Sequence, residues 1–242
     1  MKFFNIFITT NRRKLSLPPY EYIQRDIETN LHSYLNKIPS QIENIIIVGA
    51  HLGYEVNSIN KNYPNSKFIL FEVSPKYVEP LISRFKGCDF VSIYNCAISN
   101  VNGDLDFFET NTDGTGSILK VGALTRSFGI QQTNIYRVRS HTLDNHSKIN
   151  NYQEKFFDCL WVDVQGAEMA VLQGGINTLK NVRSIFIEVS TLLPLYEGGC
   201  MFEEIYQFLI QLGFRLVNLG TDHSNGTGNA FFINNNLNPS MV

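Results

Sequence analysis

Residues 44–53, with the sequence NIIIVGAHLG, carry the clearest indication of how this 242-residue chain folds. The stretch begins with the apolar, mostly β-branched run 45–48, which is typical of a strand buried on both faces of a parallel sheet. The run stops at Gly49, and apolar residues recur at helical spacing after Gly53. A strand, a glycine turn and a helix in this order favour a nucleoside-type ligand, because small residues let it approach the backbone closely.

The alternation of strands and helices continues toward the C-terminus. Further strands are predicted at 67–71, 90–94, 157–162, 182–188, 214–219 and 229–233, and an antiparallel pair at 104–109 and 135–140. Repeated strand–helix units predict an α/β fold with a mainly parallel sheet, helices on both faces and right-handed crossovers. The last two strands follow each other across a Gly/Asn/Ser-rich turn, which predicts a closing antiparallel hairpin. We predict one domain over residues 44–242, preceded by an extension with a helix over residues 1–43.

Composition excludes several classes of function. The formal net charge of −2 argues against a nucleic-acid binder, which normally presents a basic face. No apolar stretch approaches the roughly 18 residues of a membrane span. The four cysteines form no CxxC pair, and the basic residues 12–14 follow the apolar start instead of preceding it as in a signal peptide. We therefore expect a reducing, cytoplasmic location, and the apolar start could form a homodimer contact.

The end of the second strand indicates the kind of ligand. Glu72 lies 19 residues after Gly53, where a carboxylate can accept hydrogen bonds from both hydroxyls of a ribose. The alternative is that Glu72 is simply a solvent-exposed residue at the end of a strand. The glycine spacing lacks the middle glycine that admits the pyrophosphate of NAD, and Ala50 and His51 occupy that space. A cofactor without a pyrophosphate fits better, and S-adenosylmethionine is the obvious one.

A second informative stretch is residues 161–168, WVDVQGAE. Asp163 falls where the carboxyl end of a strand meets the ligand crevice of an open α/β sheet. Its alternative role is to cap the following helix. Glu168 lies in the first turn of that helix, where the dipole favours negative charge, so we interpret it as structural.

With these residues in view, the chain resembles the FkbM-type S-adenosylmethionine-dependent methyltransferases over roughly residues 45–233. The matching segments are 48–53, 71–72, Ala97 with Gly103, 142–144, DVQGAE at 163–168, Gly174, Glu188 and 196–199. The resemblance implies a Rossmann-like, seven-stranded methyltransferase sheet and O-methylation of a hydroxyl on a sugar, glycan or natural product. Ile47 replaces the family's usual Asp, which implies that one polar contact near the cofactor is missing. His51, Trp161 and Gln165 stand where Asn, Lys and Glu are commoner.

The reaction needs a base within hydrogen-bond reach of the acceptor hydroxyl. We expect Asp163 first, Glu188 second and His141 third in this role, whereas His32, His146 and His223 are expected at the surface. Asp163 and Glu188 could instead hold a divalent cation, but two carboxylates without a third ligand do not predict a metal site.

The cofactor and acceptor are each assigned a set of residues. The homocysteine end is expected at Gly49, Ala50, His51 and Gly53, with Asp163 nearby, the ribose on Glu72, and the adenine near Asn95 and Ala97. The loop 111–120 with Ser117 is the predicted acceptor lid, and Tyr196 in the segment 196–199 is its counterpart. Two other functions remain: an NAD-dependent oxidoreductase, and a catalytically silent scaffold protein with the same fold.

Overall fold

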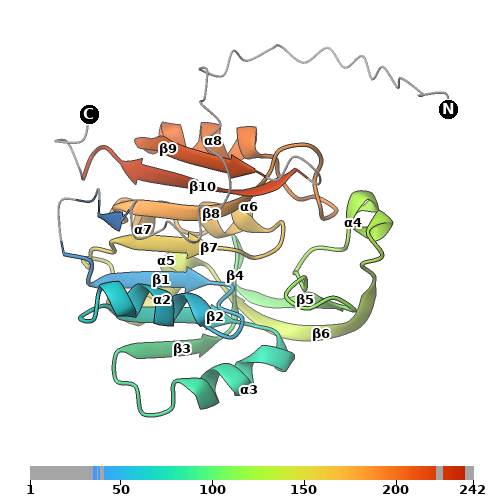
Figure 1. The fold of residues 1–242 in the computed structure, drawn as a ribbon, viewed down its shortest axis with the longest axis horizontal. Helices are drawn as coiled ribbons and strands as arrows, with labels where there is room; N and C mark the ends of the chain where they lie inside the picture. The colour runs from blue at the N-terminus through green and yellow to red at the C-terminus, as the bar shows by residue number, and fades with distance from the viewer. Residues whose placement is uncertain (1–34, 37, 39–40, 222–225, 238–242) are drawn as a thin grey trace.

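The computed structural model describes residues 35–36, 38, 41–221 and 226–237, and a seven-stranded sheet forms its centre (Figure 1). The strands lie in the order β3-β2-β1-β7-β8-β10-β9, and all neighbours are parallel except β10, which is antiparallel to β8 and β9. Their bounds are β1 Asn44–Val48, β2 Lys67–Glu72, β3 Val91–Asn95, β7 Cys159–Val162, β8 Ser184–Ser190, β9 Phe214–Thr221 and β10 Thr227–Asn234. The predicted Rossmann-like sheet and its closing hairpin are confirmed. The extension at 1–34 lies outside the described residues.

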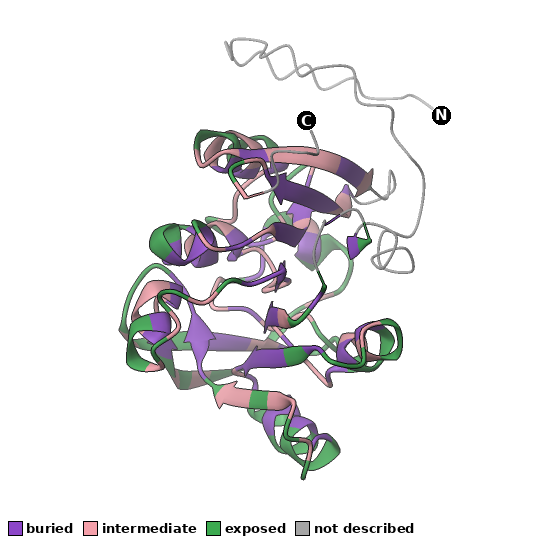
Figure 2. Cartoon of the chain, turned by 90° about the vertical axis from the view of Figure 1, so that its left-hand side faces the viewer, coloured by how far each residue is buried: buried purple, intermediate pink, exposed green. Residues whose placement is uncertain are grey.

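The period-two pattern of β1 divides the core into two layers. Ile46 and Val48 pack with apolar residues of α5 (Leu143–Ile149), α6 (Glu168–Gln173), α7 (Ile176–Leu179) and α8 (Phe202–Gln211). Ile45 and Ile47 pack on the opposite face, against α2 (Tyr54–Asn62) and α3 (Pro75–Arg84). Successive side chains of a strand point to opposite faces, so an unbroken apolar strand needs helices on both sides. Figure 2 shows the buried strands between these layers.

Ile47 therefore has a different role from the one that the resemblance implied. Its side chain is buried between the sheet and the layer of α2 and α3, beside Trp161 in the neighbouring strand β7. The side chain does not line the cavity at the end of β1, although Val48 and Gly49 do. An apolar residue at position 47 therefore contributes to the core and does not line the cavity.

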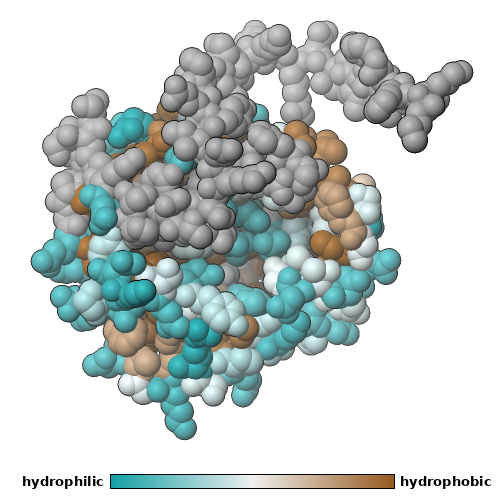
Figure 3. All heavy atoms as spheres, in the orientation of Figure 1, coloured by the Kyte–Doolittle hydropathy of each residue, from teal (hydrophilic) through white to brown (hydrophobic). Residues whose placement is uncertain are grey.

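A second, three-stranded sheet lies beyond the carboxyl ends of β1, β2 and β7 (Figure 1). Its order is β4-β6-β5, with bounds β4 Ala97–Ile98, β5 Gly103–Thr110 and β6 Gln132–His141. The antiparallel pairing of β5 with β6 confirms the predicted pair, and the short strand β4 was not predicted. The connection between β5 and β6 contains α4 (Ala123–Ser127), and hydrophobic side chains gather beside it in Figure 3. The second sheet closes one side of the cavity described below.

His146 is buried, contrary to the prediction that it lies at the surface. It is 5% exposed, and its ring meets Phe71 and Tyr94 edge-on. Burial lowers the pKa of His146 to about 4, so the imidazole is neutral at ordinary pH. The sequence offered no sign of this position because the packing partners come from β2 and β3. His32 and His223 lie outside the described residues.

Two further observations bear on expectations from composition. Within the described part of the chain, every helix is too short or too polar to cross a bilayer. Cys88, Cys96, Cys159 and Cys200 all carry free thiols, and Cys96 and Cys159 are buried.

Candidate functional site

A cavity of about 240 Å³ lies at the carboxyl ends of β1, β2 and β7. Its floor comes from the ends of these strands, and its other walls come from β4, β5 and the segment 114–118. The predicted site residues that line it are Gly49, His51, Glu72, Ala97, Ser117 and Asp163. Tyr77, Cys96, Ile98, Phe107, Trp161 and Gln165 line it as well. The cavity thus lies where ligands bind in open α/β sheets.

The glycine turn is held closely against β7. Gly49 has a φ of +87°, and a Cβ at this residue would lie 1.8 Å from the backbone oxygen of Asp163. Gly49 and Ala50 both donate their N–H groups to the carbonyl of Phe71, and Gly53 donates to Ala50. These N–H groups are therefore used within the fold. Ala50 and Gly53 shape the turn without lining the cavity, whereas Gly49 and His51 line it directly.

Glu72 joins the glycine turn to the beginning of α3. The residue is 7% exposed, and its Oε2 accepts a hydrogen bond of 2.6 Å from His51 N. Its Oε1 accepts from Val73 N at 2.8 Å and from Ser74 N at 2.7 Å. Burial raises the pKa of Glu72, and the three backbone donors oppose that rise. Glu72 lines the cavity, so one carboxylate both organises two loops and presents charge to a ligand.

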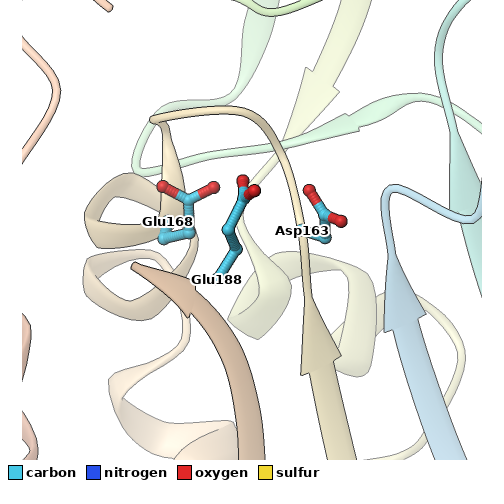
Figure 4. Close-up of side chains that lie close together, drawn as sticks. All are labelled: Asp163, Glu168 and Glu188. Atoms are coloured by element: carbon cyan, nitrogen blue, oxygen red, sulfur yellow. The ribbon is translucent and has the colours of Figure 1, made fainter. Parts of the chain in front are cut away.

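Three carboxylates meet on the β7–β8 side of the cavity (Figure 4). Asp163 follows β7, Glu188 lies in β8, and Glu168 begins α6. One oxygen from each residue lies within 4.8 Å of the others. Removal from water raises the pKa of Asp163. It also raises the pKa of Glu188 well above its usual range, and the nearby charge of Asp163 raises the Glu188 pKa further. Burial raises the pKa of Glu168 to about 7.

Hydrogen-bond donors hold this carboxylate cluster together. Gln165 Nε2 donates to Asp163 Oδ1 at 2.7 Å and to Glu188 Oε2 at 3.0 Å. Glu168 Oε1 accepts from the backbone N–H groups of Val164 and Gly166, which agrees with the structural role predicted for it. Glu168 also supplies the third carboxylate that the sequence did not place near the other two. The spacing is compatible with a cation, but amide donors already occupy an oxygen of each carboxylate.

The structure excludes the helix-cap role for Asp163. Helix α6 begins at Glu168, and its cap residue is Ala167. Asp163 lies four residues before that cap, and its side chain is held by Gln165 at the cavity wall. The carboxylate is therefore available to chemistry in the cavity.

The loop after β5 covers the cavity. Asp113 accepts hydrogen bonds from Lys76 Nζ at 2.6 Å and from Tyr77 Oη at 2.7 Å. Gly114 N donates to the same Tyr77 hydroxyl at 2.9 Å, and Ser117 Oγ donates to Val164 O at 3.4 Å. These contacts fasten the loop to α3 on one side and to the end of β7 on the other. No short motif signals Tyr77 or Phe107, whose partners are distant in sequence.

The cavity lining does not include Glu188, which lies beside Asp163, and three further predicted site residues also lie outside it. Asn95 ends β3 and is exposed, although its neighbours Cys96 and Ala97 line the cavity. His141 ends β6, and its Nδ1 lies 3.3 Å from Asn145 Nδ2, outside the cavity lining. Tyr196 is 2% exposed, and its hydroxyl donates toward Thr115 O and Gln165 Oε1. Tyr196 therefore contacts the loop that covers the cavity and the Gln165 amide of the carboxylate cluster, without lining the cavity itself.

Comparison with known proteins gives a family match, a curated relative and several distantly related solved structures. The Methyltransferase FkbM domain matches residues 48–216, which include the glycine turn and the carboxylate cluster. The 2-O-methyltransferase NoeI of Sinorhizobium fredii is 28% identical over 173 residues, or 68% of this chain and 70% of that protein. A solved NADB-Rossmann superfamily protein from Streptococcus agalactiae has 10% identity and a TM-score of 0.49, over 88% of this chain and 70% of that chain. An rRNA methylase from Streptococcus thermophilus has the same identity and TM-score, over 88% of this chain and 98% of that chain.

Proposed function

Because the chain belongs to the FkbM family of S-adenosylmethionine-dependent methyltransferases, we propose that it methylates a hydroxyl of a sugar, glycan or natural product. The observation that carries the proposal is the carboxylate cluster beside the glycine turn, which puts the Asp163 carboxylate at the cavity wall with Glu188 and Glu168 next to it. The NoeI relative is named a 2-O-methyltransferase, which supports oxygen as the acceptor atom. Family membership also excludes the NAD-dependent oxidoreductase as the alternative.

The cavity residues fit S-adenosylmethionine. Glu72 is a buried carboxylate on the cavity wall, as a ribose requires, and Ala97 and Phe107 offer apolar surface for the adenine. Gly49 leaves room beside Asp163 that any side chain would fill. When bound, the cofactor supplies an electrophilic methyl group on a sulfonium centre. The Asp163 carboxylate on the cavity wall would interact favourably with the positive charge of such a ligand.

The carboxylates supply the proton chemistry that the acceptor needs. With S-adenosylmethionine bound, the methyl group would pass from its sulfur to the acceptor oxygen, and Asp163 or Glu188 would take the proton that the hydroxyl loses. The products would be a methyl ether and S-adenosylhomocysteine. Bases are most effective when their pKa lies near the working pH, and burial moves both carboxylates in that direction.

A glycan or polyol acceptor is tested by methyl transfer from radiolabelled S-adenosylmethionine to a panel of methyl glycosides, oligosaccharides and polyol natural products. Label recovered as a methyl ether supports the proposal. Label recovered only on nitrogen or carbon contradicts O-methylation. Calorimetry with S-adenosylmethionine, S-adenosylhomocysteine and NAD accompanies the assay, because binding of none of them would favour the silent scaffold.

Substitution of Glu72 by alanine is expected to weaken cofactor binding by about 1.5–3 kcal/mol, the range for hydrogen bonds to a charged partner. The same change should lower the melting temperature, since the N–H groups of His51, Val73 and Ser74 lose their acceptor. Calorimetry and thermal unfolding measure the two effects separately. Glu43→Ala, at the protein surface before β1, is the matched control. Unchanged affinity in folded Glu72→Ala protein would remove Glu72 from the cofactor site.

A further inference from the structure

Gln165 has an unusual backbone conformation at the point where its side chain meets the carboxylates. Its φ is +57°, in the left-handed region that residues with a side chain rarely adopt, and Gly166 follows with a φ of +95°. Such a conformation is strained for a residue with a side chain and persists only where the surroundings impose it. Here the turn directs the Gln165 amide to Asp163 and Glu188.

The two ends of the Gln165 amide have different partners. The nitrogen has two hydrogens, and it lies within hydrogen-bond distance of one carboxylate oxygen from Asp163 and one from Glu188. The oxygen lies 3.0 Å from the Tyr196 hydroxyl, whose single hydrogen is shared between Gln165 Oε1 and Thr115 O. If the amide were reversed, its oxygen would face two carboxylates and it would donate nothing to them. The two acids therefore favour the orientation in which Gln165 donates to both, and the Tyr196 hydroxyl supports that orientation at the other end of the amide.

Tyr196 is itself held firmly in place. Its ring fills the space above Gly166, where a Cβ would come within 2.7 Å of the ring. Its hydroxyl is also 2.8 Å from Thr115 O, in the loop that covers the cavity. The tyrosine thus connects the closed loop with the amide that contacts the acids.

We propose that Gln165, oriented by Tyr196, is the positioning residue that holds Asp163 and Glu188 as one proton-accepting pair. The inference rests on the proposed function, because it assumes that this pair takes the proton of the acceptor hydroxyl. The carboxyl groups of Asp163 and Glu188 lie close enough to hydrogen-bond to each other, and Gln165 Nε2 donates to both of them. Without the amide donors, the pair would hold a shared proton more tightly and to a higher pH.

The inference predicts a change in titration. Two N–H donors favour the ionised form of the acids, so their loss should raise the pH at which the pair titrates by about one unit. Among the described residues, the other titratable groups that interact with the pair are Glu168 from α6, His51 from the glycine turn and the Tyr196 hydroxyl, and these remain in Gln165→Met protein. Methionine has nearly the shape of glutamine and donates no hydrogen bond.

The test is a carbon-13 carboxyl NMR titration of the full-length protein labelled at Asp and Glu, which needs no acceptor. Signals of the pair are assigned from Asp163→Asn and Glu188→Gln proteins. We expect the midpoint to rise by about one pH unit in Gln165→Met and by less in Tyr196→Phe. Tyr136→Phe, which removes a hydroxyl bound to Glu109 on the second sheet, should leave it unchanged. Wild-type midpoints in both Gln165→Met and Tyr196→Phe would overturn the inference.

Kinetics with a methyl glycoside substrate separate this inference from the proposed function. In Gln165→Met protein, kcat should fall about 10–100-fold and the acidic limb of the pH–rate profile should move to higher pH, with the KM for S-adenosylmethionine little changed. The double variant with Tyr196→Phe should be no slower than Gln165→Met alone, because the tyrosine acts through the glutamine. Full activity of Asp163→Asn would refute the proposed base. If Asp163→Asn protein is inactive while Gln165→Met and Tyr196→Phe proteins both have wild-type kinetics, the positioning role alone is refuted.

Discussion

Asp163→Asn protein is expected to lose turnover by about 10²–10⁴-fold, the loss typical of removing acid–base catalysis. Asparagine keeps the shape of the side chain, and its oxygen can still accept from Gln165 Nε2. The negative charge and the proton-accepting oxygen disappear together. We expect cofactor affinity and melting temperature to change little, because the helix cap of α6 does not involve this residue.

The measurement combines initial rates, calorimetry with S-adenosylhomocysteine and thermal unfolding, each with and without a chelator. The matched control is Asp144→Asn, because Asp144 accepts hydrogen bonds from Asn177 and Thr178 at the start of α7, away from the cavity. That control should lower stability and leave the rate per folded molecule unchanged. Activity lost on chelation would instead assign the carboxylate cluster to a cation. A fully active Asp163→Asn enzyme would transfer the role of base to Glu188, because Glu188 lies beside Asp163 whereas the His141 ring lies beside Asn145, away from this cluster.

Local sequence patterns were sufficient to predict the central sheet. The strand β1 has apolar side chains on both faces, and its parallel neighbours have the same pattern, so burial and sheet type followed from periodicity. Asp163 and Glu188 could be placed close together because both were predicted near the carboxyl ends of strands, and Asp163 lines the cavity. Neighbouring parallel strands bring such residues to one edge without knowledge of any side-chain contact.

The remaining features depend on contacts between distant segments. Tyr77 reaches the cavity because Asp113 and Gly114, more than 35 residues away, bind its hydroxyl. The second sheet requires the short strand β4 to pair with the end of β6, and a two-residue strand leaves no periodic signal. The burial of His146 and the inward position of Ile47 likewise depend on which face a neighbouring helix covers. Single-sequence patterns do not contain that information.

Gly49→Ala should be the most destabilising of the substitutions considered, at about 3 kcal/mol or more, because it combines backbone strain with a backbone clash. The new Cβ would lie 1.8 Å from the carbonyl oxygen of Asp163 and 2.9 Å from its carbonyl carbon. Neither atom belongs to a flexible side chain, so the end of β7 must move away from β1. That movement also displaces the Asp163 side chain, and we expect cofactor affinity to fall more than tenfold in whatever protein remains folded.

Gly87→Ala isolates the steric part of this effect. Gly87 has a φ of +81°, close to the +87° of Gly49, and a Cβ there would meet no atom within 4 Å. Alanine at Gly87 therefore carries only the cost of the left-handed conformation, about 1–2 kcal/mol. Urea unfolding of both variants gives the difference, which measures how closely the glycine turn packs on β7. Equal losses of stability in the two proteins would contradict the close contact, and Gly49 would then be required only for its backbone conformation.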